Sequence, residues 1–403
     1  MPRVKARIVG AALLCLVASI LPRATSSSAP SSAAAAAAFS GVPLATSSAP
    51  PVARGPGSAG ASTRPSIGGP GTASELASGV GGGGFANQPL IPFRGVTVLL
   101  YGNDPSFATK TAVLLDRLAG LGAHSVSLTI PFFQSASVSA TDVHMDPVVT
   151  PTLANLRIFI AAAHQRGMSV LLRPLLDDLN IQQADNFQGQ WRGTLNPQPR
   201  ILWYGNYETQ VLLPLASLGA SAGLDVLDVG SELQSLEGDT AAWLNVISHV
   251  RGVYSGALTF STNWGHPFPA FGGSLNFLGI DAFYPLSAPV NANVAQLVAA
   301  WQPWLNQAAQ IRTTWGKPVV FTELGTTSQV GSFVQPWNWN NHQPLSLETQ
   351  RLYYQAACQA ARPFKIGLFW WAYNFDPLTS PSTDPGYDPQ GKPAESEIAR
   401  CYS

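Results

Sequence analysis

The stretch Lys317-Pro318-Val319-Val320-Phe321-Thr322-Glu323-Leu324-Gly325 decides the fold, together with the segment Val294–Trp315 that precedes it. Residues 294–315 have apolar side chains at helical spacing and predict a long amphipathic helix. β-Branched and aromatic residues favour extended backbone, so residues 318–322 predict a strand that ends directly before a carboxylate. A helix that leads into a short apolar strand is the unit from which parallel sheets are built.

The same alternation of strands and helices extends in both directions from this stretch. Strands are predicted at residues 93–100, 125–131, 169–175, 224–229, 257–262, 277–282, 318–322 and 366–373. Helices are predicted at residues 106–121, 152–166, 207–222, 240–254, 294–315 and 346–361. The fifth crossover is short, rich in Gly and Pro, and has no clear helix. This pattern predicts a single (β/α)8 TIM barrel over residues 89–403. A doubly wound open sheet is the alternative, although no Gly-rich dinucleotide fingerprint follows the first strand.

Two segments of different character precede the predicted barrel. A signal peptide is predicted over residues 1–24, because the basic residues Arg3, Lys5 and Arg7 precede an apolar run, Ile8–Leu21, that is shorter than a membrane span. An uncleaved N-terminal anchor is the alternative. Residues 25–88 are dominated by Ala, Ser, Pro, Gly and Thr, which predicts a disordered linker. We therefore expect a secreted protein, extracellular or cell-wall associated, with no transmembrane domain beyond the signal segment.

The charge distribution limits the classes of partner. Only 11% of residues are charged, and the 22 basic and 22 acidic residues balance over the whole chain. Six of the basic residues but one acidic residue lie in residues 1–86, so the body carries a net charge of −5. A mildly acidic body argues against nucleic acid as a partner. None of the six histidines is spaced for metal binding, and we expect no metal and no cofactor.

Two cysteines, Cys358 and Cys401, remain in the chain beyond the predicted signal peptide. Two cysteines in an exported protein indicate one disulfide, which would attach the C-terminus to the outer ring of helices. Two unpaired buried thiols are the alternative.

A barrel carries its chemistry at the carboxyl ends of its strands, and the sequence places polar and aromatic residues there. The predicted strand ends are Arg173-Pro174-Leu175-Leu176-Asp177-Asp178, Gly230-Ser231-Glu232-Leu233, Asn263-Trp264-Gly265, Asp281-Ala282-Phe283-Tyr284-Pro285, Thr322-Glu323-Leu324-Gly325 and Trp370-Trp371-Ala372-Tyr373. They contain two glutamates and several aromatic rings, but no Ser/His/Asp constellation.

Glu232 and Glu323 end the fourth and seventh predicted strands, on opposite sides of the barrel mouth. Paired carboxylates perform glycoside hydrolysis: one donates a proton to the leaving oxygen, and the other attacks the anomeric carbon or activates water. The alternative is a pair of structural carboxylates bound to arginines or backbone amides.

Aromatic residues near the same strand ends offer flat faces for sugar rings. They are Trp191, Trp264, Tyr284, Trp337, Trp339, Trp370 and Trp371. The segment Trp337-Asn338-Trp339-Asn340-Asn341 has neither strand nor helix periodicity, which favours an exposed binding loop over a packed one. Any single ring could instead belong to the core.

At these residues the chain resembles the retaining barrel glycosidases of clan GH-A, and most closely glycoside hydrolase family 113, the β-mannanase family. The resemblance extends in order over about residues 92–400. The stretches that carry it are Trp191-Arg192-Gly193-Thr194, Asp228-Val229-Gly230-Ser231-Glu232-Leu233, Gly279-Ile280-Asp281-Ala282-Phe283-Tyr284-Pro285-Leu286, the stretch 317–325 quoted above, and Gly386-Tyr387-Asp388-Pro389-Gln390-Gly391-Lys392-Pro393-Ala394-Glu395.

The resemblance implies a role for each residue of the site. Glu232 would be the acid/base and Glu323 the nucleophile, with Tyr284 hydrogen-bonded to Glu323. Trp371 would stack on the sugar at the cleavage subsite, with Trp370 as the alternative ring. Further substrate-binding residues are expected to be Ser231, Asn263, Trp264, Trp191 and Arg192.

The sequence departs from the family pattern at two positions. Ser231 stands where many clan members have an Asn that contacts the sugar 2-hydroxyl. Leu175 stands where family members often have His. The prediction is a secreted retaining β-glycoside hydrolase that takes a polysaccharide or oligosaccharide, most closely a β-1,4-mannan or related mannoside. The alternatives are a barrel glycosidase for another β-glycan such as a glucan, and a non-catalytic carbohydrate-binding barrel.

Overall fold

Eight parallel strands close into a barrel in which each strand pairs with its neighbours in sequence and β1 pairs with β8. The computed structural model describes residues 93–339 and 341–403. The predicted signal peptide and linker lie outside these residues. The predicted barrel is confirmed, and the open-sheet alternative is wrong. The strands are β1 (Arg94–Leu99), β2 (Ser125–Phe132), β3 (Ser169–Leu176), β4 (Val226–Ser231), β5 (Ala257–Asn263), β6 (Leu278–Asp281), β7 (Val319–Leu324) and β8 (Gly367–Asn374).

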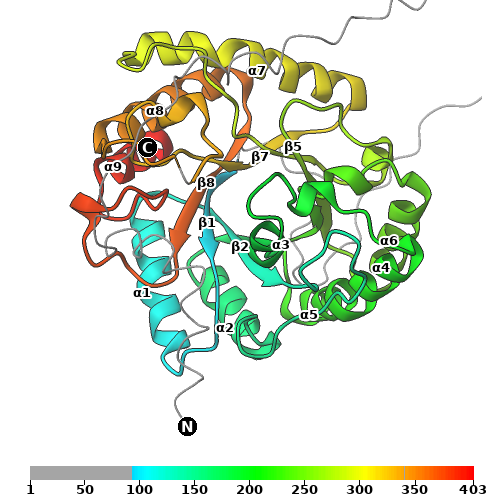
Figure 1. The fold of residues 1–403 in the computed structure, drawn as a ribbon. Coiled ribbons are helices and arrows are strands. Elements are labelled where there is room, and N and C mark those ends of the chain that lie inside the picture. Colours follow the sequence, from blue (N-terminus) through cyan, green and yellow to red (C-terminus); the bar gives the residue numbers. More distant parts are fainter. Residues whose placement is uncertain (1–92, 340) are drawn as a thin grey trace, which may run out of the picture. The chain divides into compact units, whose positions relative to one another are not determined.

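Helices surround the strands as a ring (Figure 1). The α-helices are α1 (Phe107–Gly120), α2 (Leu153–His164), α3 (Leu179–Ala184), α4 (Arg200–Tyr207), α5 (Leu213–Ala222), α6 (Thr240–Val253), α7 (Val294–Trp315), α8 (Leu347–Ala361) and α9 (Pro393–Tyr402). The shorter turns are η3 (Arg192–Thr194), η4 (Glu208–Leu212, a π-helical turn), η5 (Gln234–Leu236), η6 (Ala270–Ser274), η7 (Ser332–Val334), η8 (Arg362–Phe364) and η9 (Pro381–Thr383).

The predicted strands and helices lie within a few residues of the observed ones. The fifth crossover contains only the short turn η6, as its Gly/Pro-rich sequence predicted. α7 follows its prediction residue for residue. Asn293 and Gln296 form a reciprocal capping box at its start, and Gly316 ends it in the left-handed conformation (φ 61°). The sequence analysis missed α3, α4 and α9.

The barrel interior is apolar at the amino-terminal ends of the strands and polar towards their carboxyl ends. A separate core cluster fills the amino-terminal end, with side chains from neighbouring strands or, for Phe277, from the residue directly before β6: Leu171, Val226, Ala257, Phe277, Val320 and Phe369. Successive inward positions of a strand are two residues apart. The next inward positions therefore hold Arg173, Asp228, Thr322 and Trp371, so the change from core to site occurs within a single step of two residues.

Three strands carry one extra residue near their carboxyl ends. β4 advances from Asp228 to Ser231 while β5 advances only from Thr259 to Ser261. Similar register shifts occur in β7, between Phe321 and Leu324, and in β8, near Trp371. Such bulges bend a strand and redirect its side chains, and they are common beside active sites.

No helix among the described residues is both long and apolar enough to span a membrane. The C-terminal helix α9 packs against α8. Cys358 of α8 and Cys401 of α9 form a disulfide across this contact, with their Cα atoms 5.8 Å apart. The predicted disulfide is confirmed, and the alternative of two free thiols is wrong.

We expect the double substitution Cys358→Ala/Cys401→Ala to lower the free energy of unfolding by about 2–4 kcal/mol, because the unfolded chain loses a cross-link. Denaturant titration of both proteins without reductant measures the difference. Adding a reductant should then destabilise the wild type and leave the variant unchanged. Equal unfolding midpoints for the two proteins without reductant would contradict a stabilising role for the bond.

Candidate active site

Glu232 follows the bulged end of β4 in an unusual backbone conformation. Its φ angle is +55°, in the left-handed region that few non-glycine residues adopt. Only 8% of the residue is exposed, and it lines a cavity at the ends of the strands. The strained conformation and the bulge together turn this carboxylate towards the barrel mouth.

Glu323 reaches the same cavity from β7. A regular strand would alternate its side chains, so that Thr322 and Glu323 would point to opposite faces. The register shift places both near the barrel interior: Thr322 donates a hydrogen bond to Asp281 (2.8 Å), and Glu323 lines the cavity at 2% exposure. Gly325 permits the close approach of β8, because a Cβ atom there would lie 2.3 Å from the carbonyl oxygen of Trp371.

A buried guanidinium, Arg173 of β3, joins the strands beneath the cavity. It donates to Glu323 (2.7 Å), to both oxygens of Asp281 (3.0 and 3.1 Å) and to Asp228 (3.2 Å). It also donates to the hydroxyl of Ser231 (3.0 Å). Arg173 is 0% exposed, so these acceptors replace its entire hydration shell. One cation thus binds three carboxylates from β4, β6 and β7.

This cluster has an excess of negative charge, which perturbs its carboxyl groups. Burial raises the pKa of Asp281 to about 7, against the opposing charge of Arg173. Burial, reinforced by the charge of Asp281, also raises the pKa of Glu323 well above its ordinary value. The charge of Glu232 acts on Glu323 in the same direction, so the two glutamates lie within electrostatic reach of each other. Protons that enter the cluster are therefore held more tightly than by free carboxylates.

A second arginine binds the other glutamate. Arg192 begins the turn η3 and donates to Glu232 (2.6 Å) and to Asp178 (2.8 Å). Its neighbour Trp191 folds back over Gly193, where a Cβ atom would lie 2.2 Å from the indole ring. Glycine at this position is what allows Trp191 and Arg192 to face the cavity together.

The cavity above the two glutamates has a volume of about 900 Å³. Aromatic, polar and charged side chains line it together: Leu175, Asp178, Gln182, Phe187, Gly189, Gln190, Trp191, Arg192, Glu232, Gln234, Asn263, Trp264, Gly265, His266, Phe283, Glu323, Trp337, Trp339, Trp371 and Tyr387. This mixture of flat rings and hydrogen-bonding groups suits a sugar, which has apolar C–H faces and polar edges.

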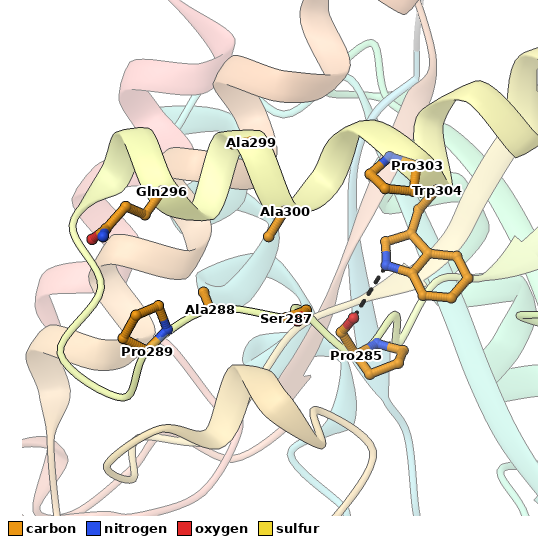
Figure 2. Close-up of a pocket in the computed structure, with 9 residues that line it drawn as sticks. All are labelled: Pro285, Ser287, Ala288, Pro289, Gln296, Ala299, Ala300, Pro303 and Trp304. Carbon is orange, nitrogen blue, oxygen red and sulfur yellow. Dashed lines mark hydrogen bonds between the residues drawn. The ribbon is translucent and has the colours of Figure 1, made fainter. Parts of the chain in front are cut away.

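One wall of the cavity is built from aromatic rings that pack against one another in tilted and edge-on arrangements. Trp337 lies 5.1 Å from Trp264 at an angle of 32°, and it remains 41% exposed. Behind them, the ring of Trp304 of α7 lies 5.8 Å from that of Trp264, and its indole N–H donates to the carbonyl of Pro285. Figure 2 shows this bond beside a separate hollow between α7 and residues 285–289. The wall is thus supported from outside the barrel.

The structure brings together seven of the ten predicted catalytic and substrate-binding residues. Those that line the cavity are Trp191, Arg192, Glu232, Asn263, Trp264, Glu323 and Trp371. Trp337 and Trp339, predicted as an exposed binding loop, line it too.

Three predicted substrate-binding residues do not line this cavity. Ser231 is buried, where its hydroxyl accepts from Arg173 and donates to Asp228. Trp370 points outward and stacks on Tyr354 of α8 at 4.4 Å, because neighbouring strand residues face opposite sides.

Tyr284 is the third. It is 1% exposed, and its ring stacks on that of Trp304 at 4.8 Å. The hydrogen bond from Tyr284 to Glu323 that the resemblance implied is not formed in the described part of the chain. Arg173 donates to Glu323 instead.

The sequence analysis placed Arg173 and Asp178 at the strand ends and quoted Asp228 in a motif, but it did not include them among the predicted catalytic and substrate-binding residues. The buried position of Arg173 could have been predicted from the sequence. A charged residue inside an apolar strand, two positions after the inward Leu171, needs a buried partner. The cavity residue Tyr387 lies in the quoted stretch 386–395 but was given no role, and Phe187 lies in a loop whose sequence has no strand or helix period. Among residues 93–339 and 341–403, no group of three or more His, Cys, Asp or Glu side chains could hold a metal ion.

Comparison with known proteins agrees with this geometry. The model of Glycoside Hydrolase Family 113 matches residues 96–392. The chain belongs to this family. It is therefore a glycoside hydrolase, and the family implied by its strand-end residues is confirmed. A comparison with curated protein sequences finds no match.

Solved structures share the fold of this family 113 barrel. The β-mannanase AaManA of Alicyclobacillus acidocaldarius is 23% identical, with a TM-score of 0.66 over 77% of this chain and 97% of its own. A second family 113 β-1,4-mannanase, solved as a complex, is 21% identical, also with a TM-score of 0.66, over 77% of this chain and 98% of its own. A family 5 mannosidase of Rhizomucor miehei is more distant, at 12% identity and a TM-score of 0.50, over 77% and 92%.

We expect Asp281→Asn to move the acidic limb of the pH profile of kcat/KM to lower pH. The negative charge of Asp281 raises the pKa of Glu323, so its removal lowers that pKa. A nucleophilic carboxylate reacts in its ionised form. Activity falls as the pH drops through the pKa of this group, and a lower pKa therefore delays the loss. Initial rates over a pH series measure the shift.

The matched control for this experiment is Asp116→Asn, at an exposed carboxylate paired with Arg166. Its acidic limb should coincide with that of the wild type. An acidic limb that stays in place or moves to higher pH in Asp281→Asn would contradict the electrostatic coupling between Asp281 and Glu323.

Proposed function

We propose that the protein is a secreted retaining β-glycoside hydrolase that acts on β-1,4-mannan or related mannosides. The observation that carries the proposal is the presence of Glu232 and Glu323 in one cavity, each bound by its own arginine. The family 113 structures that share this fold are β-mannanases, which supports mannan as the substrate. The basic and apolar pattern of residues 1–24 supports export.

In the first step Glu323 attacks the anomeric carbon. The bond to the leaving oxygen breaks as protonated Glu232 donates its proton to that oxygen, and a glycosyl ester forms on Glu323. Arg173 fixes the attacking carboxylate through its hydrogen bond to Oε1 of Glu323. The electron pair of the broken bond leaves with the departing sugar.

In the second step Glu232, now ionised, removes a proton from a water molecule that attacks the anomeric carbon. The ester to Glu323 breaks, and the two inversions together retain the configuration. This mechanism needs the two carboxyl groups about 5–5.5 Å apart. Both glutamates line the same cavity, which is the arrangement that this mechanism requires.

The aromatic wall supports a glycan rather than a small ester or phosphate as substrate. Trp264, Trp337 and Trp371 line the cavity from three separate segments, so a sugar chain can contact more than one ring. Leu175, which also lines it, leaves an apolar surface where a polar glycone contact was expected. This apolar surface favours testing another β-glycan, such as a glucan, as the second candidate.

A hydrolysis panel of mannan, glucomannan, cellulose, xylan and β-1,3-glucan tests the proposal. Release of reducing sugar from mannan at the highest rate is the expected result, and ¹H NMR of the first product should detect the β-anomer before mutarotation. If reducing sugar is released fastest from a glucan, the proposed substrate is a β-glucan instead of mannan. An α-anomer formed first would contradict the retaining mechanism, and binding without release would favour the non-catalytic barrel.

Substitution of the two glutamates separates their roles. Glu323→Ala should abolish turnover of every substrate, because no glycosyl ester can form. Glu232→Ala removes the proton donor, so aryl glycosides with good leaving groups should react better than polysaccharides. Added azide should then accelerate turnover by attacking the ester, and its product should have the β configuration. Equal losses on both substrate types, without azide rescue, would remove Glu232 from the acid/base role and make Asp177, Asp178 and Asp281 the next candidates.

A further inference from the structure

Arg192 is held on several sides at the edge of the cavity. Its Nε donates to the carbonyl oxygen of Leu176 (2.8 Å), and its Nη2 donates to Oδ1 of Asp178 (2.8 Å). Its backbone N–H donates to Oδ2 of the same Asp178 (2.7 Å). Asp178 is itself nearly inaccessible, with 4% of its side chain exposed. The guanidinium therefore has a fixed position before any ligand arrives.

The remaining part of this fixed group binds one oxygen of Glu232. Nη1 of Arg192 donates to Oε2 of Glu232 at 2.6 Å. Within residues 93–339 and 341–403, no hydrogen bond is made to Oε1 of Glu232, while the residue lines the cavity. The two carboxyl oxygens are thus unequal: the arginine occupies one and leaves the other for a ligand.

We propose that Arg192 is a positioning residue that holds Oε2 of Glu232, so that Oε1 is the atom that gives and takes the proton. The inference rests on the proposed function in that Glu232 is the acid/base. The proton on Oε1 moves to the leaving oxygen as the glycosidic bond breaks, and Oε1 later receives a proton from water. Arg192 keeps its own protons throughout.

The backbone at Glu232 explains why such a clamp is needed. The residue follows a bulge and adopts φ +55°, and its backbone N–H still donates to the carbonyl oxygen of Ser261 in β5 (2.9 Å), so the strand anchors the backbone but not the carboxyl group. A general acid must lie within hydrogen-bond reach of the atom it protonates. A planar guanidinium that is itself bound to the carbonyl of Leu176 and to Asp178 restrains the carboxyl plane in a way that a single flexible donor does not.

The test uses aryl β-glycosides that the wild type hydrolyses, ranging from poor to good leaving groups. For Arg192→Met, we expect kcat/KM to fall by about 10²-fold with poor leaving groups, on the order of the contribution of a general acid. With a dinitrophenyl leaving group, kcat/KM should change by no more than about threefold, because this group departs with little protonation. Arg192→Lys keeps the charge without the fork and should show a weaker form of the same pattern.

Three further measurements separate positioning from other roles. Arg200→Met removes an arginine that pairs with Asp239 and does not line the cavity, and all its rates should stay near those of the wild type. A 2-fluoro dinitrophenyl glycoside should still label Glu323 in Arg192→Met, because ester formation from it needs no acid. If Arg192→Met fails to fold, Asp178→Asn releases the guanidinium without touching Glu232 and should give the same leaving-group dependence.

Two outcomes would overturn the inference. A uniform loss across all leaving groups with raised KM would make Arg192 a sugar ligand, and unchanged rates would make it irrelevant to Glu232. The failure of mannan as the substrate is a separate result, because the series uses whichever aryl glycoside the wild type cleaves. Parallel leaving-group behaviour of Arg192→Met and Glu232→Gln is the result that supports the positioning role.

Discussion

The site depends on the burial of Arg173 beneath three carboxylates. A guanidinium with no exposed surface is stable only where its donors are satisfied, and removing one partner of a buried ion pair typically costs about 3–5 kcal/mol. Asp228, Asp281 and Glu323 provide the acceptors from three different strands. These contacts offset the free-energy cost of removing the cation from water. The same contacts therefore fix the separation of β4, β6 and β7 directly beneath the two glutamates.

Strand bulges turn this fixed frame into a site. Regular strands at the barrel mouth would point Glu323 and its neighbour Thr322 to opposite faces, and Glu232 would have an ordinary extended backbone. The extra residues in β4, β7 and β8 break this alternation where the functional side chains lie. The barrel below the bulges keeps its regular apolar layer, so the irregularity is confined to the end of the strands that carries the chemistry.

The sequence allowed the barrel, the two glutamates and the disulfide to be predicted, because each depends on a local pattern. Strand and helix periodicity is visible over ten residues, and residues at the ends of apolar runs stand out. The choice between Trp371 and its alternative Trp370 stayed open because neighbouring strand residues face opposite sides, and the register that decides which one faces the cavity is not contained in the sequence. Ser231 and Tyr284 were misplaced for a related reason: the partners that bury them, Arg173 and Trp304, are distant in the chain.

The two glutamates differ in their arginines, and this difference matches two different tasks. Arg173 is fully buried and binds two other carboxylates besides Glu323, so the attacking group is held in a dry, rigid cluster. Arg192 and Glu232 are partly exposed at the cavity rim, with 18% and 11% of their side chains accessible. A nucleophile needs a fixed line of attack, whereas an acid/base must meet a leaving sugar in one step and a water molecule in the next. The buried cluster suits the first requirement, and the accessible pair suits the second.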